Sequence, residues 1–360
     1  MKDKRIKVLV PHRLISHPYL FLLYTHLSKL SIKIMSLDNL LNIILGFISV
    51  NILHFHWIEN FFRSKRKPLY ILRFLIFLFC LQIIKFFLKK KIIVTLHNVL
   101  PHEILDKRLD IIGFSMILKI ADIVIVHNKF SYTSCINFYK ILPSKVYVIP
   151  HGNFIKYYLD KISKEDARRL LQIRNDSFVI LFFGHIRRYK GLERILPILE
   201  ELLNNYPNLV VLLAGNCRDS LLKQELISLA QRFKNRILLH IGYIPDKYVQ
   251  VYMGAADIGV IPYKRIWTPG SLLLFMSFSK PVIIPRLPAV VEVIGKEYEL
   301  YFDPYEDRQL KHSIERAITL HSNNSLRKVG LHLYAKVLEY KWEDIAFQTR
   351  RLYEKVIYHA

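Results

Sequence analysis

The chain has 360 residues, of which 52% are hydrophobic, and a formal net charge of +24. This apolar content can fill one or two complete cores, which excludes a disordered chain, and the length predicts one large or two ordinary domains. The positive charge favours partners that carry anionic groups, namely a nucleic acid, a phosphorylated substrate or an anionic membrane surface.

The chain opens with the charged segment Met1 to Arg5, and the apolar run that follows it, Ile6 to Pro11, is too short for an export signal. Its three cysteines are widely separated, which predicts neither a disulfide framework nor a zinc site and fits a reducing cytoplasm. We therefore expect a cytoplasmic protein.

Short runs of β-branched and aromatic residues alternate with longer helical stretches along the chain. These runs predict strands at 6–11, 32–37, 52–57, 92–97, 123–127, 146–150, 178–183, 209–214, 237–242, 258–262, 282–285 and 300–302. Strands so uniformly apolar are buried on both faces, which is typical of parallel, doubly wound α/β sheets. There are more predicted strands than a single domain core of this kind contains. We predict two Rossmann-like domains, 1–155 and 156–340, followed by a last helix at 341–360.

The segment 69–88 is strongly apolar, yet Arg73, Gln82 and Lys85 interrupt it. Nine lysines and arginines, and no acid, lie between Glu59 and Glu103. The longest uncharged run has 11 residues, fewer than the ~18 of a spanning helix. We predict a helix at a membrane interface, with a buried domain helix and a transmembrane span as alternatives. The residues expected to enter the lipid are Phe74, Phe77, Leu78 and Leu81.

The sharpest local signal runs from Phe183 to Gly191, with the sequence FGHIRRYKG. A strand ends at Gly184, a basic loop follows, and Gly191 opens a helix. Gly184 lets a ligand approach the main chain, the helix start offers free amides, and Arg187 and Lys190 add charge. This combination suits a diphosphate, and an ordinary basic turn is the alternative.

A second helix start lies at Thr268-Pro269-Gly270-Ser271-Leu272. Gly270 and Ser271 can present amides and a hydroxyl to an anion at the positive end of the helix. Taken alone, however, this segment is explained more simply by an ordinary N-cap from Thr268 or Ser271.

Histidines end several strands of the first half: His54, His56, His97 and His127. Ligands of doubly wound sheets bind at the carboxyl ends of strands, so His97 is a candidate for chemistry, whereas we expect His54 to be a hydrogen-bonded core residue. No histidine pair has the spacing of a zinc protease, and no nucleophile elbow or Walker loop is present. We therefore expect neither a metal nor a cofactor.

Together these segments resemble the GT-B glycosyltransferases, especially the large bacterial and archaeal group with phosphatidylinositol mannosyltransferases and exopolysaccharide enzymes. The resemblance covers nearly the whole chain and rests on the order of its pieces, which are Ile149–Asn153, Phe182–Gly191, Leu213–Gly215, Ile241–Asp246, Ala255–Tyr263, Lys280–Ile283, Phe302–Pro304 and the last helix with Trp342. It implies two Rossmann-like domains that face a central cleft, with the last helix crossing back to the first domain.

The resemblance also implies roles for single residues. The second domain would bind a nucleotide sugar, and the donor-binding residues would be Gly184, Arg187, Lys190, Gly191, Ile244, Tyr263, Thr268, Gly270, Ser271 and Leu272. His97 matches a family histidine near the donor sugar. His185 stands where the family usually has arginine. Ile266 and Leu274 stand where many members have two glutamates, so the segment from Tyr263 to Ser271 is closer to a subgroup with Tyr-x-x-x-x-Thr-x-Gly-Ser.

We therefore expect a hexosyltransferase that acts at the inner face of the cell membrane. Its acceptor is expected to be a lipid-linked glycan intermediate of polysaccharide or glycolipid synthesis. A retaining route needs no protein base, whereas an inverting route needs one near the acceptor hydroxyl. The expected catalytic residues are His97 and Glu103, and the acceptor-side candidates are His12, His56, Glu59, Asn98 and His102. The alternatives are a nucleotide-sugar epimerase, a non-catalytic sugar-nucleotide-binding protein and, remotely, a nucleic-acid binder.

Overall fold

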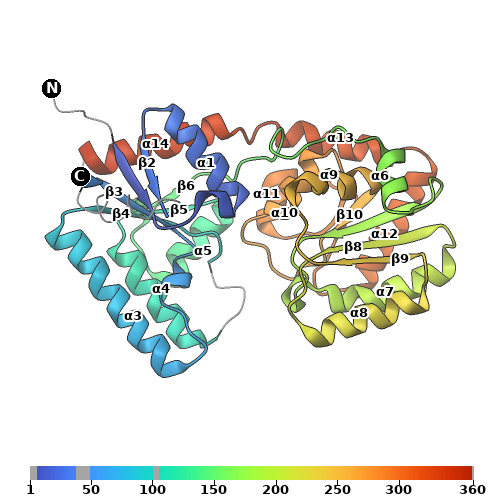
Figure 1. Ribbon diagram of the computed structural model, residues 1–360, viewed down its shortest axis with the longest axis horizontal. Coiled ribbons are helices and arrows are strands. Elements are labelled where there is room, and N and C mark those ends of the chain that lie inside the picture. Colours follow the sequence, from blue (N-terminus) through green and yellow to red (C-terminus); the bar gives the residue numbers. More distant parts are fainter. Residues whose placement is uncertain (1–5, 38–48, 100–104, 359–360) are drawn as a thin grey trace. The chain divides into compact units, whose positions relative to one another are not determined.

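The computed structural model describes residues 6–37, 49–99 and 105–358. Two of the predicted site residues, His102 and Glu103, lie outside these ranges. The chain divides into two compact units (Figure 1). Unit 1 consists of residues 1–152 and 340–360, and unit 2 consists of residues 153–339.

Unit 1 is built on a parallel sheet with the strand order β2-β1-β3-β4-β5-β6. Among the described residues its strands are β1 Lys7–Val10, β2 Lys33–Ser36, β3 Ile52–His56, β4 Lys91–Thr95, β5 Ile123–Val126 and β6 Val146–Val148. The central strands β3 and β5 are buried along their whole length, as their continuous apolar runs predict.

The helices of unit 1 cover both faces of this sheet (Figure 1). One face carries α1 Pro18–Lys29 and α14 Trp342–Tyr358, and the other carries α3 Lys67–Gln82, α4 Lys107–Ile120 and α5 Lys129–Tyr139. Short turns of helix are η1 Leu14–Ser16, η2 Ile58–Phe61, η3 Ile83–Phe87, which is a π-helical continuation of α3, and η4 Pro143–Lys145.

Helix α14 returns from the end of unit 2 and packs against α1 in unit 1, as the resemblance implies. Gly152 of unit 1 also lies directly against α14, because an added Cβ there would lie 2.3 Å from the Trp342 ring. Trp342, Ile345 and Leu352 are buried, as predicted. The prediction for the last turn is wrong by one residue, because Val356 is buried there and Ile357 is only half-buried.

Unit 2, all of whose residues are described, contains a second parallel sheet with the order β12-β11-β10-β7-β8-β9. Its strands are β7 Phe178–Phe183, β8 Leu209–Gly215, β9 Ile237–Ile241, β10 Ile258–Val260, β11 Val282–Pro285 and β12 Tyr301–Phe302. Two such sheets with helices on both faces confirm the predicted α/β, doubly wound fold class.

The helices of unit 2 also form two layers (Figure 1). One face of the sheet carries α7 Leu192–Asn205, α8 Ser220–Arg232 and α12 Asp307–Ser322. The other carries α6 Lys164–Leu170, α9 Asp246–Ala255, α10 Gly270–Ser277, α11 Pro288–Ile294 and α13 Leu326–Val337. A 3-10 turn, η5 Arg188–Lys190, precedes α7.

Every predicted strand is present, but several end one or two residues before the predicted boundary. β4 ends at Thr95 and β5 at Val126, so His97 and His127 lie just beyond the sheet. These residues belong to the loops at the carboxyl edge, where side chains of doubly wound sheets meet ligands.

Helix α3 is apolar on two faces. Tyr70, Phe74, Leu78 and Leu81 are buried against unit 1. The most exposed apolar residues are Leu72 (55%), Leu75 (55%), Ile76 (54%), Phe79 (62%) and, in η3, Phe86 (65%) and Phe87 (81%). The prediction that Phe74, Leu78 and Leu81 enter a lipid phase is therefore wrong, because these residues form the core face of the helix.

Candidate active site

The loop after β7 is held in place by close main-chain contacts. Gly191 has a φ of +71° and begins α7, and an added Cβ there would lie 2.1 Å from the carbonyl oxygen of Pro262. Only glycine combines this backbone conformation with so close an approach. Ile186 pairs with Cys217 in a parallel bridge, so the loops after β7 and β8 lie side by side.

Lys190 connects this loop to the start of α10. Its side chain is buried, and its Nζ lies 5.0 Å from the centre of the Tyr263 ring. The Tyr263 hydroxyl lies 3.4 Å from Ser271 Oγ. The structure thus brings together Lys190, Tyr263 and Ser271, which lie on three different segments of the chain. We call this group the donor cluster.

Helix α10 begins at Gly270, and its N-cap residue is Pro269, with no capping side chain. The simple interpretation of this segment as a helix capped by Thr268 or Ser271 is therefore wrong. The first amides of an α-helix have no hydrogen-bond acceptor within the helix. The amides of Gly270, Ser271 and Leu272 therefore remain available to an anion. Leu272 can contribute only this amide, because its side chain is buried in the core.

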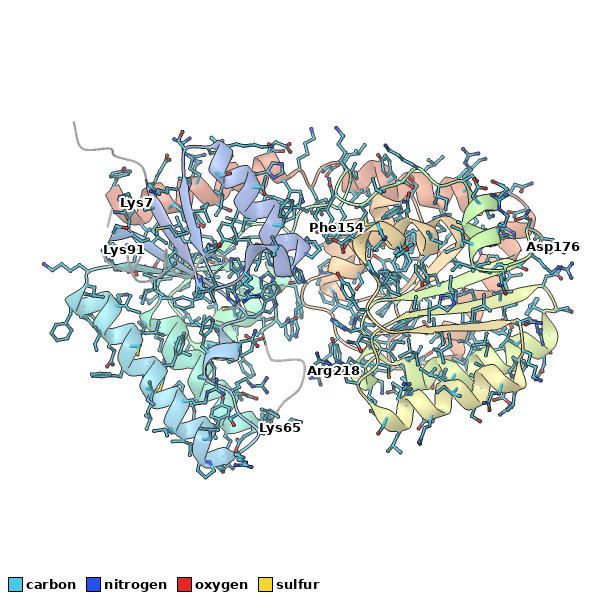
Figure 2. The ribbon with its side chains drawn as sticks, viewed as in Figure 1. Lys7, Lys65, Lys91, Phe154, Asp176 and Arg218 are labelled. Atoms are coloured by element: carbon cyan, nitrogen blue, oxygen red, sulfur yellow. The ribbon has the colours of Figure 1, made fainter. Side chains whose placement is uncertain are left out.

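Positive charge gathers around His185. Burial, Lys190, Arg187 and Arg218 all lower the pKa of His185. Arg218, in the loop after β8, was missed by the sequence analysis (Figure 2). A basic residue three positions after Gly215, at the carboxyl edge of the sheet, was the available signal. These three cations create a positive potential around one loop. An anionic ligand bound there would stabilise the loop by balancing this charge.

Arg188 belongs to the same loop but has a different environment. It lies 2.7 Å from Asp219 and 3.5 Å from Glu225, so its charge is compensated within unit 2. Arg188 thus anchors the loop to the start of α8, whereas the positive charges of the cations beside His185 act on that ring.

The remaining donor-side residues lie at the same edge of the sheet. Gly184 follows β7, and Ile244 is half-buried in the loop after β9. The amide of Gly242 donates to the carbonyl of Gly215 at 3.1 Å, which joins the loops after β8 and β9. Unit 2 therefore places all the predicted donor-binding residues along one edge.

Two buried polar atoms lack a hydrogen-bond partner among the described residues: His12 Nε2 and Glu193 Oε2. Glu193 lies in the first turn of α7, two residues after Gly191, and sequence analysis did not select it. His12 follows β1 and was predicted on the acceptor side. A buried atom without a partner is uncommon in folded proteins and often marks a place where a ligand completes the site.

The carboxyl edge of unit 1 holds a row of hydrogen-bonded histidines. His56 Nδ1 lies 3.2 Å from His97 Nε2, and His97 Nδ1 lies 3.1 Å from His127 Nε2. His127 Nδ1 lies 2.9 Å from the carbonyl oxygen of Ile149. His56, His97 and His127 come from the ends of β3, β4 and β5, and we call them the histidine chain.

All three rings of the histidine chain are buried. Burial lowers the pKa of His127 to about 4 and takes the pKa values of His56 and His97 well below the usual range. Burial also lowers the pKa of His151, which follows β6, to about 3. These rings are therefore neutral at physiological pH. Among the described residues, no group of histidine, cysteine or acidic side chains could hold a metal ion.

His54 occupies the core beneath this edge. Its Nε2 lies 2.8 Å from Thr95 Oγ1, and its Nδ1 lies 2.7 Å from the hydroxyl of Tyr353 on α14. This confirms the prediction of a hydrogen-bonded core histidine and also ties α14 to the sheet.

Trp57 is the residue after β3 and adopts a left-handed backbone conformation, with a φ of 41°. Its ring stacks on His97, with 4.3 Å between the ring centres and an interplanar angle of 10°. A bulky residue in this conformation is strained, and such strain is often found at functional sites. The sequence pattern does not identify Trp57, because a backbone conformation cannot be read from an apolar run.

Two other acceptor-side candidates are described. Glu59 lies in η2, and burial raises the pKa of its carboxyl group, against an opposing effect of Arg63. Asn98 is half-buried directly after His97. A carboxyl group with a raised pKa is a better proton acceptor near neutral pH than an ordinary one.

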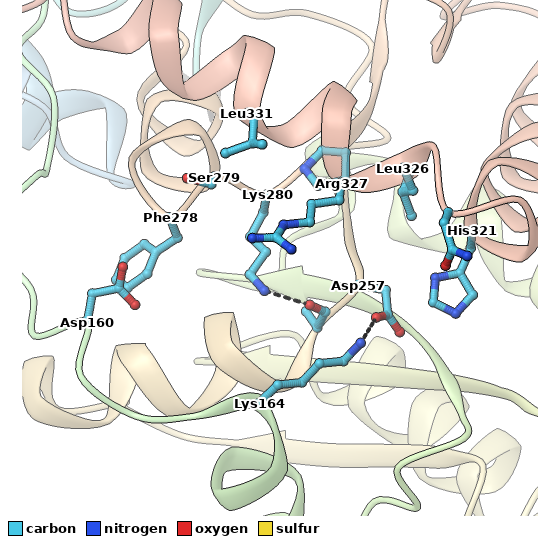
Figure 3. A pocket seen from close by; sticks show the side chains of 13 residues that line it. Asp160, Lys164, Asp257, Phe278, Ser279, Lys280, His321, Leu326, Arg327 and Leu331 are labelled. Carbon is cyan, nitrogen blue, oxygen red and sulfur yellow. Dashed lines mark hydrogen bonds and ion pairs between the residues drawn. The ribbon is translucent and has the colours of Figure 1, made fainter.

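A cavity of about 760 Å³ opens at the other end of the unit 2 strands (Figure 3). Lys164 lies 2.6 Å from Asp257, and Arg168 binds the second oxygen of Asp257 at 2.7 Å. Lys280 donates to the carbonyl of Ala256, and burial lowers its pKa to about 8. Because this cavity lies at the amino ends of β10 and β11, it is separate from the donor cluster.

The carboxyl edge of unit 2, which holds the donor cluster, belongs to a segment that matches a known protein family. Residues 163–330 match the model of the glycosyl transferases group 1. These residues form a group 1 glycosyltransferase domain. The matched segment includes the donor cluster, Arg187, Arg218 and the start of α10.

Two bacterial glycosyltransferases are among the sequence relatives of this chain. Over 134 residues the chain is 28% identical to a GDP-mannose:glycolipid 4-beta-D-mannosyltransferase of Xanthomonas campestris, which covers 36% of the chain and 38% of that enzyme. Over 170 residues it is 24% identical to a putative teichuronic acid biosynthesis glycosyltransferase of Bacillus subtilis, covering 47% and 40%. The chain thus spans less than half the length of either relative.

Solved structures resemble the whole chain. The Anabaena protein HepE, in complex with UDP and glucose, has a TM-score of 0.72 and 16% identity, with coverage of 97% of this chain and 99% of HepE. Sucrose-phosphate synthase from Thermosynechococcus elongatus has a TM-score of 0.74 and 17% identity, with coverage of 99% and 100%. At this identity the likeness shows the fold, which is GT-B.

Proposed function

We propose that this protein transfers a hexose from a nucleoside-diphosphate sugar to a hydroxyl group of an acceptor. The donor cluster carries this proposal, because it joins a buried lysine to an uncapped helix start at the carboxyl edge of a glycosyltransferase domain. The Xanthomonas relative is named for GDP-mannose, and HepE was solved with UDP and glucose. Both names fit a donor that consists of a nucleotide and a hexose.

The chemistry of transfer requires stabilisation of the leaving diphosphate, which gains negative charge as the sugar departs. Lys190, Arg187 and Arg218 would supply positive charge at fixed positions, and the first amides of α10 would donate hydrogen bonds. Such groups are already oriented before the reaction and therefore favour the transition state. Ile244 would contact the base through its main chain.

The acceptor would bind at the histidine edge of unit 1. In a retaining route the leaving phosphate can take the acceptor proton itself, so no protein base is needed. In an inverting route Glu59, whose pKa is raised by burial, would be the described carboxyl group suited to that task. Glu103 and His102 are further candidates from the sequence.

The test is a donor-turnover assay with the purified full chain and a panel of nucleotide sugars, supplied with extracted bacterial lipids as acceptors. Release of a nucleoside diphosphate together with a labelled glycolipid is the expected result. Binding of nucleotide sugars without turnover would support a non-catalytic sugar-nucleotide-binding protein. Interconversion of the donor sugar without transfer would instead support an epimerase.

We also propose that α3 places unit 1 on the cytoplasmic surface of an anionic membrane, where a lipid-linked acceptor lies. Within the described residues, 67–87 form a helix long and apolar enough to cross a membrane, with a mean hydropathy of 2.1, and it is 28% buried. Because the buried part packs against unit 1, the exposed face can lie flat in the interface.

The charge around α3 supports this orientation. Three of the nine basic residues between Glu59 and Glu103 are paired with aspartates: Arg63 with Asp110, Lys67 with Asp106 and Lys85 with Asp122. The basic residues at the two ends of the helix include Lys65, Arg66, Lys89 and Lys91. Each lysine or arginine near an anionic surface contributes about 1 kcal/mol to binding.

Liposome sedimentation tests the membrane proposal. The full chain is expected to sediment with vesicles that contain anionic lipid, less so in high salt, because salt screens the attraction beyond about 8–10 Å. Phe79→Glu should reduce sedimentation, whereas Leu221→Glu, at an equally exposed leucine (64%) of α8, should not. Equal binding by both variants would contradict a role for this face.

A further inference from the structure

The histidine chain has a direction, which its last hydrogen bond determines. His127 Nδ1 faces the carbonyl oxygen of Ile149 at 2.9 Å. A carbonyl oxygen can only accept a hydrogen bond, so Nδ1 of His127 must carry a proton. Since this ring is neutral, its Nε2 carries none and can only accept.

The same rule then determines the next two rings. His127 Nε2 accepts from His97 Nδ1 at 3.1 Å, so His97 has its proton on Nδ1 and accepts at Nε2. His97 Nε2 in turn accepts from His56 Nδ1 at 3.2 Å. The main-chain carbonyl of Ile149 therefore orders the protons of three side chains that lie at or just after the ends of three different strands.

The groups beyond His56 are compatible with this order. His56 Nε2 must accept, and the Tyr24 hydroxyl lies 2.6 Å away and can donate to it. His54 Nδ1 can donate to the oxygens of Tyr24 at 2.9 Å and Tyr353 at 2.7 Å, and His54 Nε2 can accept from the Thr95 hydroxyl at 2.8 Å. Each ring along this path then has its proton on Nδ1, and no pair of facing atoms conflicts.

We propose that His127 is a positioning residue that sets the tautomer of His97 and holds its ring at the carboxyl end of β4. Stacking on Trp57 fixes the plane of His97 but leaves the position of its proton undetermined. His127 supplies the missing constraint, because it is itself fixed by the main chain. The importance of His97 for transfer rests on the proposed function, whereas its tautomer is a property of the chain without substrate.

The order of the protons has a consequence for the reaction. Both nitrogens of His97 already bond to neighbouring rings, so His97 cannot take a proton from the acceptor without breaking the histidine chain. His97 is then a neutral ring of fixed orientation at the carboxyl edge of unit 1, where the acceptor is proposed to bind. The acceptor proton passes to the leaving diphosphate or to a carboxylate instead.

Nitrogen-15 NMR of the histidine-labelled full chain tests the proposal directly, because long-range correlations distinguish a protonated from an unprotonated ring nitrogen. The expected result is a proton on Nδ1 and none on Nε2 for His56, His97 and His127. A proton on Nε2 of His97 in the wild type would overturn the proposal, whatever any variant does.

Two variants of His127 separate positioning from packing. His127→Phe keeps a flat ring but offers His97 no acceptor, so the proton of His97 should no longer be confined to Nδ1, and turnover should fall at least tenfold. His127→Gln can still donate to Ile149 and accept from His97, so the tautomer and most of the turnover should be retained. Equal losses in both variants, with an unchanged tautomer, would reduce His127 to a packing residue.

His151→Phe is the matched control, because His151 is equally buried and its Nδ1 donates instead to the carbonyl of Gly152 at 2.7 Å. This change should leave the tautomer of His97 on Nδ1. If the tautomers are as expected but no variant or wild type transfers sugar, the proposed function fails and the positioning role of His127 stands. If sugar is transferred while His97 carries its proton on Nε2, the reverse holds.

Discussion

Lys190 is the residue on which donor binding should depend most. Its ammonium group is buried beside Tyr263, at the junction of two loops, and a phosphate would give it the counter-ion that this position favours. We expect Lys190→Ala to lower kcat/KM for the donor at least tenfold, which corresponds to about 1.4 kcal/mol. Steady-state kinetics and nucleotide titration measure the change.

Arg188→Ala is the control for Lys190, because it removes a cation from the same loop. Arg188 is paired with Asp219 and Glu225, so its loss should alter donor affinity less than threefold. An effect of Arg188→Ala as large as that of Lys190→Ala would show that overall loop charge, and not the donor cluster, binds the donor.

Some site residues could be predicted from the sequence and others could not. Lys190 and Ser271 are found from local patterns, since a glycine, a cation and a helix start follow one another along the chain. Arg218 is indicated only by its position shortly after Gly215, and Trp57 depends on a left-handed backbone, which no local pattern encodes. The bonds among the histidines depend on the alignment of β3, β4 and β5 in the sheet, which periodicity alone does not determine.

At the scale of elements, the strands were predictable and the orientation of α3 was not. A strand buried on both faces is a continuous apolar run, and such runs are easily distinguished from their polar neighbours. Helix α3 is apolar all round, so the sequence contains no contrast that identifies its inner face. The structure shows that Phe74 faces the core and Phe79 faces outward.

Helix α14 should contribute strongly to the stability of unit 1. Its buried residue Ile345 is 2% exposed, so Ile345→Ala should lower the free energy of unfolding by about 2–5 kcal/mol. Phe347→Ala, on the outer face of the same helix and 53% exposed, should cost far less. Chemical denaturation followed by tryptophan fluorescence in a Trp267→Phe background measures both, and equal effects would contradict the packing of α14 on unit 1.

The whole molecule should lose stability in mildly acidic solution. Burial lowers the pKa of His54 and His151 to about 3 and that of His127 to about 4. Between these values and the unfolded pKa of 6.5, the unfolded chain binds protons that the folded chain does not, so stability falls as the pH falls. Between pH 7.5 and 5.5 the three rings together should cost about 4 kcal/mol.

The measurement is a series of unfolding curves from pH 7.5 to 5.5. In a Trp267→Phe background the remaining tryptophans, Trp57 and Trp342, both belong to unit 1, so their fluorescence isolates the unit that carries the histidines. His151→Gln should reduce the stability lost between pH 7.5 and 5.5 by about 1.4 kcal/mol. A midpoint of unfolding that does not change with pH would show that the rings are not held neutral.

The path of the chain also determines the order in which the two units are completed during translation. Residues 153–339 lie within the sequence of unit 1, because α14 follows them and completes that unit. On the ribosome, unit 2 emerges whole and can fold while unit 1 still lacks the helix that covers α1 and bonds to His54. His54 therefore gains its bond to the Tyr353 hydroxyl only when translation has passed α14. A ribosome that stalls after residue 339 would release a chain with an intact donor domain and an unfinished partner, which quality-control proteases could recognise by its exposed apolar surface.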